Sequence, residues 1–305
     1  MDFGKNAVSS LSPVVHSCVT VNNDHRGPGE LESSVQQEQL RVYYTTLLDA
    51  WGQPYWWPAR TRFEVIVGAY LTQNTAWTNV ERALRQLHLR RVLNVAGIRR
   101  VPLAELEKAI HSAGYFRQKA QRLKAFVAFL DEHYAGSLSR MFAQPTEKLR
   151  EELLALNGIG PETADSILLY AGQHPVFVVD AYTRRILDRH QLLPDKASYD
   201  EARALCESAL NAEARLHTRA GENPDPATHT SSPHPSPALP HAPGRARPHG
   251  ACHLPSPMSL AKRTPLAQIY NNMHGLIVGV GKHYCLKTRP RCDECPLQKF
   301  LPGVK

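Results

Sequence analysis

Apolar residues in this chain recur three or four positions apart through most of its length, which is the spacing of a helix. The pattern is clear in the segments 40–48, 63–71, 118–130 and 266–277, with glycine or proline near several of the expected helix ends. Alternation typical of a half-buried strand is almost missing, since the apolar run at 176–179 is too short to build a sheet. We therefore expect an all-α fold.

Composition divides the 305 residues into four parts. We expect a disordered tail at 1–35 and a helical core at 36–210, with a helical hairpin at about 146–172. Residues 211–264 hold ten of the 23 prolines and six of the 15 histidines without helical periodicity, so a disordered insertion is expected there. A closing helix and a cysteine loop are expected at 265–305.

Lysine and arginine (36) outnumber aspartate and glutamate (28), which gives a net charge of +8 and an isoelectric point near 9.2. This balance suits a polyanionic partner such as nucleic acid, although such a charge also serves solubility alone. The sequence contains no run of 18 apolar residues, and its first residues lead us to expect neither a secretory signal nor a transit peptide. We therefore expect a cytoplasmic, nucleoid-associated monomer that makes no membrane contact.

The segment 156–165 is the most informative part of the sequence. Gly158 and Gly160 stand two apart between an amphipathic helix and a helix that opens with Pro161, which describes a tight reversal. The backbone amides of these glycines and of Ile159 would lie near the positive end of the second helix, where a phosphate oxygen is favoured. Any turn between two helices can use glycine, so this pattern by itself leaves a purely structural role open.

A single carboxylate, that of Asp180, follows twenty residues after the second glycine. The apolar run at 176–179 delivers it to the start of a predicted helix, where it would cap free backbone amides. Capping is an ordinary structural task, but it also holds the side chain in place and favours its ionised form near the helix dipole. The Asp180 carboxylate is therefore expected to be fixed in position and ionised at the start of this helix.

The pattern Leu-x-Gly-Ile-Gly-x-x-Thr-Ala at 156–164, followed by Val-Asp-x-x-x-x-Arg at 179–185, resembles a known signature. It is similar to the helix-hairpin-helix, Gly/Pro-rich loop and Asp of the endonuclease III superfamily of DNA glycosylases. The resemblance extends to 63–75, to Gly-Tyr-Phe-x-x-Lys-Ala at 114–120 and to the terminal cysteines. It implies a two-lobed all-α fold, base excision repair, and double-stranded DNA containing a damaged base as the partner.

The resemblance also implies catalytic roles. A glycosylase breaks a C1′–N bond through an oxocarbenium-like sugar, and the Asp180 carboxylate would stabilise that cation or take a proton from water. Bifunctional members carry a lysine two residues after the second hairpin glycine, but Glu162 stands there and cannot form a Schiff base.

We therefore expect a monofunctional glycosylase. The alternatives are a bifunctional glycosylase and abasic-site lyase, or a non-catalytic protein that binds damaged DNA. Glu162 would act as a second acid or base, or would only complement the helix dipole.

Other candidates for DNA contact are the hairpin backbone, two amide side chains after a predicted helix and two adjacent arginines: Gly158, Ile159, Gly160, Gln73, Asn74, Arg184 and Arg185. The resemblance implies that the amides reach into the duplex near the flipped base, while the hairpin and the arginines would hold phosphates. The ordinary alternatives are turn residues and a solvated helix face. Tyr115 would stack or wedge at the DNA, unless it belongs to the core.

Three cysteines near the end of the chain, Cys285, Cys292 and Cys295, match the first three ligands of the [4Fe–4S] loop in the same superfamily. The fourth ligand would stand six residues later, where this chain has Leu301. A complete cluster would need Cys252, Cys206 or a different ligand, so zinc or no metal are the alternatives. The last 41 residues carry six basic and two acidic groups, which places much of the positive charge beside this loop.

Overall fold

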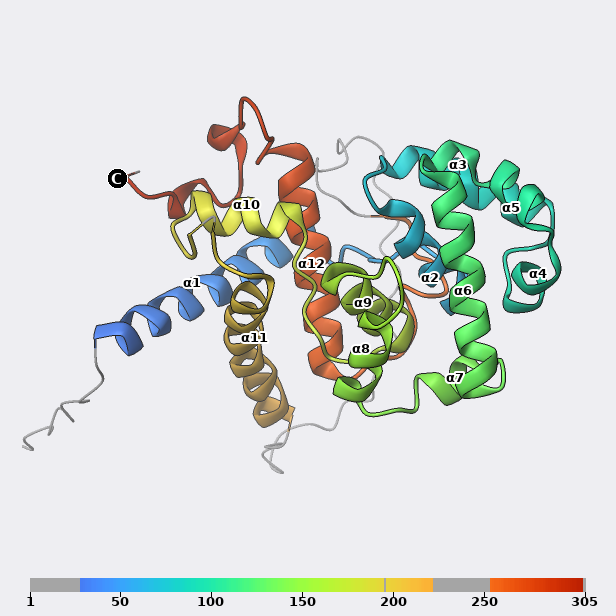
Figure 1. Cartoon of the computed structure of the whole chain (residues 1–305). Coiled ribbons are helices and arrows are strands. Elements are labelled where there is room, and N and C mark those ends of the chain that lie inside the picture. The colour runs from blue at the N-terminus through green and yellow to red at the C-terminus, as the bar shows by residue number, and fades with distance from the viewer. Residues whose placement is uncertain (1–27, 195, 222–252, 304–305) are drawn as a thin grey trace, which may run out of the picture.

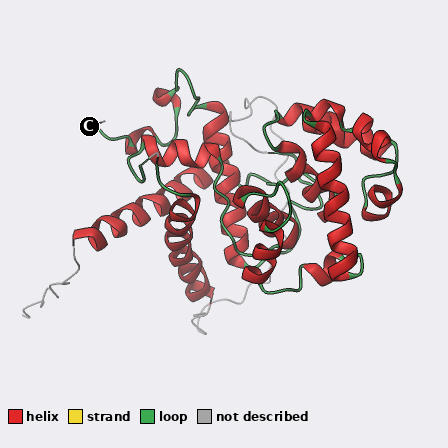
Figure 2. Cartoon of the chain, viewed as in Figure 1, coloured by secondary structure: helices red, strands yellow, loops and turns green. Residues whose placement is uncertain are grey.

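The computed structural model describes residues 28–194, 196–221 and 253–303, and this part of the chain is helical, without strands (Figure 2). This confirms the expected all-α class. Short 3-10 turns and loops join twelve α-helices within the described residues: α1 (Pro28–Trp51), α2 (Arg62–Thr72), α3 (Trp77–Leu89), α4 (Val95–Arg100), α5 (Leu103–Ala109), α6 (Phe116–Tyr134), α7 (Leu138–Met141), α8 (Thr146–Leu154), α9 (Pro161–Ser166), α10 (Ala181–Arg189), α11 (Tyr199–Gly221) and α12 (Pro265–His283).

The helices form the two expected lobes (Figure 1). Helices α2 to α9 make one lobe, in which α6 packs against α2, α4, α5 and α7. Helices α1, α10, α11 and α12 make the other, so the first and last helices pack together although they are far apart in the sequence. Contacts of α12 with the π-helical turn Ile167–Gly172, which continues α9, join the lobes.

Helix α12 runs through the middle of the molecule, and it is buried along most of its length (Figure 1). Thr264 caps its start, because its hydroxyl accepts from the backbone N–H of Ala267 at 3.3 Å, and Pro265 occupies the first turn. All residues from Asn271 to Gly281 are buried. A polar side chain on this stretch must therefore find its partners inside the protein.

The structure corrects three of the expected boundaries. Helix α1 begins at Pro28, not at 36, because proline is well tolerated in the first turn and a helix anchored by buried residues such as Tyr43 extends by one hydrogen bond per residue. Helix α11 continues to Gly221, beyond the expected end at 210. The rest of the expected tail and insertion, 1–27 and 222–252, lies outside the described residues.

The third correction concerns the end of the expected insertion, because residues 253–264 pack against the segment before α2. The backbone N–H of His253 donates to the carbonyl of Pro54 at 3.2 Å, and that of Met258 donates to Ala59 at 3.1 Å. The Met258 side chain is buried, and its contacts offset the entropy of ordering the segment.

None of the helices in the described ranges is long and apolar enough to cross a lipid bilayer.

Candidate active site

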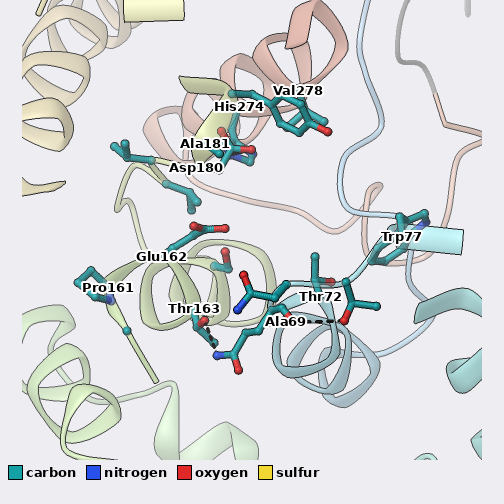
Figure 3. Close-up of a pocket in the computed structure, with 18 of the residues that line it drawn as sticks. Ala69, Thr72, Trp77, Pro161, Glu162, Thr163, Asp180, Ala181, His274 and Val278 are labelled. Atoms are coloured by element: carbon teal, nitrogen blue, oxygen red, sulfur yellow. Dashed lines mark hydrogen bonds and ion pairs between the residues drawn. The ribbon is translucent and has the colours of Figure 1, made fainter. Parts of the chain in front are cut away.

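A pocket of about 1100 Å³ opens where the two lobes meet. Asp180, at the start of α10, and Glu162, in the first turn of α9, both line it, and Figure 3 shows their side chains near one another. The hairpin and the loop after α2 line the pocket from one lobe, while α12 contributes residues such as His274 from the other. The two predicted carboxylates are thus brought into one cavity.

Asp180 caps α10 as the sequence predicted. Its Oδ1 accepts from the backbone N–H of Thr183 at 2.8 Å and from the Thr183 hydroxyl at 3.0 Å. Two donors on one oxygen, at the start of a helix, hold this carboxylate in a fixed rotamer. Its Oδ2 lies 3.7 Å from Nε2 of His274.

Glu162 has a different environment. Its side chain keeps a solvent-facing surface, but the carboxyl lies within the pocket, and this partial burial, together with the negative charge of Asp180, raises the pKa of Glu162 to about 7. Arg184 opposes this shift. Two neighbouring carboxyl groups, of which Glu162 carries a proton in a substantial fraction of molecules near neutral pH, can supply a base and an acid to one reaction.

The hairpin turn is built around its two glycines. Gly158 has φ +80°, and a Cβ there would lie 2.0 Å from Nε of Arg122, so only glycine fits without rearrangement. Gly160 is different, since a Cβ added to it would meet nothing within 4 Å. The Ile159 side chain is buried at 7% exposure and its backbone N–H donates to the carbonyl of Leu156, so Ile159 anchors the turn within the protein.

Gln73 is occupied within the protein. Its amide nitrogen donates to the carbonyl of Gly158 at 2.8 Å and to the Thr163 hydroxyl at 3.0 Å, while its Oε1 accepts from Arg122 at 3.0 Å. It therefore ties the loop after α2 to the hairpin. The neighbouring Asn74 lines the pocket in a left-handed conformation with φ +52°.

Tyr115 is not a core residue. Its side chain is 68% exposed at the rim of the same pocket, on a backbone with φ +45°. Lys119 holds this rim together, since its ammonium donates to the carbonyls of Leu71 and Ala113 and to the Thr75 hydroxyl at 2.7–2.9 Å. Burial lowers the pKa of Lys119 to about 8. Three simultaneous contacts use all the donors of this lysine.

The two predicted arginines point in different directions. Arg184 lines the pocket and donates to the carbonyl of Ala197 at 2.7 Å. Arg185 instead donates to the carbonyls of Cys285 at 2.7 Å and Gly281 at 3.3 Å, so it anchors the cysteine loop to α12. These two hydrogen bonds within the protein account for the position of the Arg185 side chain.

Sequence reasoning missed several pocket residues on α12. His274, Val278 and Lys282 recur four positions apart and all line the cavity, a spacing that could have indicated one functional face. Lys282 lies with its Nζ 5.7 Å from the ring centroid of Trp56, a pocket residue that is itself buried. Burial lowers the pKa of Lys282. The Lys282 side chain is therefore part of the pocket lining.

The cysteine loop does not provide four metal ligands. Cys285, Cys292 and Cys295 line a small cavity of about 20 Å³, and Leu301 lines it where a fourth thiolate would stand. Cys206 is buried in α11 and is not among the residues around this cavity, while Cys252 lies outside the described residues.

Arg189 donates to Sγ of Cys285 at 3.2 Å. In the described ranges no three histidine, cysteine or acidic side chains are grouped so as to hold a metal ion. A four-thiolate cluster therefore does not fit these residues, and no chemical step is assigned to one.

Comparison with known proteins agrees with this geometry. The model of the HhH-GPD superfamily base excision DNA repair proteins matches residues 67–212. A protein of Methanocaldococcus jannaschii that is provisionally named a DNA repair glycosylase is 37% identical over 265 residues, which cover 86% of this chain and 96% of the relative. This chain belongs to the HhH-GPD superfamily of base excision DNA repair proteins. It is accordingly a DNA glycosylase in the general sense of that family.

Three further known proteins show lower sequence identity to this chain. Endonuclease III of Thermotoga maritima is 31% identical over 129 residues, which cover 42% of this chain and 55% of the relative. Among solved structures, an endonuclease III in a non-covalent DNA complex gives a TM-score of 0.58 at 18% identity, with 87% of this chain and 95% of the other covered. The H. pylori 3-methyladenine DNA glycosylase bound to 1,N6-ethenoadenine gives 0.56 at 24% identity, with 82% and 97% covered. These two likenesses show the shared fold.

Proposed function

We propose that this protein is a monofunctional DNA glycosylase that hydrolyses the N-glycosidic bond of a damaged or mispaired base in double-stranded DNA and leaves an abasic site. One observation carries the proposal: the Asp180 and Glu162 carboxyls line one pocket, with Glu162 at the position where a Schiff-base lysine would be required. The pocket is large enough for a base rotated out of the duplex.

Asp180 acts on the sugar. As the C1′–N bond breaks, positive charge develops on the sugar, and the Asp180 carboxylate stabilises it. Water then forms the new C1′–O bond and gives a proton to this carboxylate. The two hydrogen bonds from Thr183 hold Oδ1, so the carboxylate does not need to reorganise during the step.

Glu162 acts on the leaving base. A carboxyl with a pKa of about 7 carries a proton in a substantial fraction of molecules near neutral pH, and can pass that proton to the departing base nitrogen. The departing base therefore need not leave as an anion. The neighbouring negative charge of Asp180 supports this assignment, because it is one cause of the raised pKa.

Several features support a duplex as the partner. The amide of Gly160, at the open side of the hairpin, is suited to a phosphate, and Tyr115 presents an exposed ring at the pocket rim that can stack within the DNA. Asn74 lines the same pocket. The solved relatives named above include one bound to DNA and one bound to a modified adenine, which makes damaged DNA the class to test first.

The decisive experiment uses Asp180→Asn, since asparagine still caps a helix. Wild-type protein is screened on duplexes with uracil, alkylated, oxidised or mispaired bases, and alkali reveals abasic sites. On the duplex that is processed, we expect Asp180→Asn to lose about 10²- to 10⁴-fold in base release with DNA affinity retained. Asp188→Asn, an exposed residue of the same helix, is the matched control. An Asp180→Asn variant with wild-type turnover contradicts the proposal, and so does a wild type that binds damaged duplex without releasing any base.

A second candidate function, abasic-site lyase activity, has one observation in its favour. Lys282 lines the same pocket and could supply an amine to C1′ in place of the missing hairpin lysine. Borohydride reduction distinguishes the two functions, because only an amine nucleophile leaves a covalent protein–DNA adduct. We expect no adduct with the wild type. An adduct that disappears in Lys282→Arg would favour the lyase.

A further inference from the structure

Two buried polar side chains, Tyr170 and His274, contact each other, and His274 also lies close to the second carboxylate oxygen of Asp180. Nδ1 of His274 lies 2.6 Å from the hydroxyl of Tyr170, and Nε2 of the same ring lies 3.7 Å from Oδ2 of Asp180. Figure 3 shows His274 on α12 beside Asp180. The glycosylase chemistry proposed above uses neither His274 nor Tyr170.

We infer that His274 is a positioning residue for Asp180, and that the Tyr170 hydroxyl orients its ring so that Nε2–H faces Oδ2. The inference rests on the proposed function of Asp180. It assigns His274 no contact with substrate, so its effect on catalysis passes through the carboxylate.

The His274 ring is buried among aromatic side chains, and one of its nitrogens has no hydrogen-bond partner in the part of the chain that the structure describes. His274 is 3% exposed, and the rings of Trp56, Tyr170 and Phe177 surround it at centroid distances of 5.8–6.3 Å. Within the described residues, its Nε2 has no hydrogen-bond partner. A buried polar atom without a hydrogen-bond partner destabilises the fold. An apolar side chain at this position would therefore give a more stable protein, which indicates that Nε2 of His274 has a functional role.

The tautomer follows from the neighbours. Burial lowers the pKa of His274 and favours the neutral ring, which has a single N–H. If that hydrogen were on Nδ1, the Nε2 lone pair would face the carboxylate. With the hydrogen on Nε2, Tyr170 donates to Nδ1 and the N–H points at Oδ2.

Thr183 holds only one side of the Asp180 carboxylate, because both of its hydrogen bonds go to Oδ1. The His274 contact is on the other side, and a shift of under 1 Å turns 3.7 Å into a hydrogen bond. Oδ2 would then be held as Oδ1 is, which keeps the plane of the carboxylate fixed in the cavity. A hydrogen bond to a charged group of this kind corresponds to about a 10- to 100-fold effect on rate.

Two substitutions separate this role from simple packing. In His274→Gln the side-chain amide nitrogen comes near the position of Nε2, so a donor toward Asp180 is kept. In His274→Asn the amide comes near the position of Nδ1, so only the partner of Tyr170 is kept. We expect single-turnover base release to fall about 10- to 100-fold in His274→Asn and to stay near the wild-type rate in His274→Gln, with duplex affinity and melting temperature retained.

If His274 had only a structural role, through its contact with Tyr170, His274→Asn would release the base faster than His274→Gln. Wild-type rates in His274→Asn, or equal defects in both variants, overturn the inference. If His274→Asn does not fold, Tyr170→Phe decides: it should slow base release in the wild-type background but not in His274→Gln, and no effect in either overturns the inference. The Asp180→Asn result is measured separately, so failure of the proposed function is recognised independently.

Discussion

The side-chain amide of Gln73 donates to the carbonyl oxygen of Gly158 at 2.8 Å, so the loop after α2 holds the hairpin turn in place. Arg122 of α6 completes the junction, because it donates to Oε1 of Gln73 and lies where a side chain on Gly158 would be. The position of the hairpin backbone in the pocket therefore depends on Arg122 and Gln73, which lie 36 and 85 positions before Gly158 in the sequence.

The two hairpin glycines are expected to differ. Gly158→Ala places a Cβ at φ +80° and against Arg122, so we expect a loss of about 1–3 kcal/mol in the free energy of unfolding and weaker DNA binding. Gly160→Ala meets open space, so its stability should stay within about 1 kcal/mol of the wild type while DNA affinity falls. Denaturant unfolding and a duplex titration measure both quantities. Equal stabilities for the two variants would show that Arg122 moves aside freely.

Glu162 should make base release depend on pH near neutrality. With a pKa of about 7, the acid form is lost as pH rises from 6 to 8, so the wild-type rate should fall across that range. Glu162→Gln has no carboxyl to titrate at this position. Its base-release rate should be lower and should not fall between pH 6 and 8. If the rate of the variant still falls over this pH range, a group other than Glu162 causes the pH dependence.

The same carboxyl affects stability with a definite sign. Its folded pKa lies above the ordinary value of 4.5, so ionisation destabilises the folded state as pH rises through about 4.5 to 7. Glu162→Gln should therefore raise the melting temperature relative to the wild type at pH 8 and have little effect at pH 4. A benefit that is larger at pH 4 would contradict the raised pKa.

The buried pair of Arg150 and Asp165 joins the two hairpin helices, α8 and α9. Nε and Nη2 of Arg150 donate to the two carboxylate oxygens at 2.7 and 3.2 Å, with side-chain exposures of 12% and 0%. Arg150→Met leaves a buried carboxylate without its partner, so we expect a loss of about 3–5 kcal/mol at neutral pH. Burial already raises the pKa of Asp165, and without Arg150 the pKa rises further, so the loss should be larger at pH 8 than at pH 5.

The exposed pair of Arg99 and Asp131 is the control for that measurement. Its contacts are 2.5 and 2.8 Å, but the side chains are 44% and 37% exposed, so Arg99→Met should lower the free energy of unfolding far less than Arg150→Met does. Chemical denaturation of both variants compares the two pairs. Similar losses would mean that burial does not set the strength of the Arg150 contact.

Leu301 should limit iron binding at the cysteine loop. Because three thiols and this leucine line one cavity, Leu301→Cys should raise the iron content per chain over that of the natural sequence, as measured by metal analysis and visible absorption. Leu301→Ser alters the same position without adding a thiolate. Equal iron in all three proteins would show that the fourth position is irrelevant.

Much of the fold was predictable because it depends on local rules. Helical spacing located the main helices, and the capping role of Asp180 followed from its place before a helix. The boundary at residue 264 was wrong, since residues 253–264 gain their order from Pro54 and Ala59, some two hundred positions earlier. Composition records only the tendency of a segment to order by itself.

By itself, the sequence determined the all-α class, the glycine turn, Asp180 as a helix cap and the place of Glu162 two residues after the second glycine. These depend on residue type and on neighbours within one helical turn. Only the tertiary structure decided that Gln73 holds the hairpin, that Arg185 holds the cysteine loop, and that His274 lies beside Asp180. The reason is physical: burial, the pKa of Glu162 and the partners of a buried histidine depend on which distant segments pack together, and sequence spacing does not encode those distances.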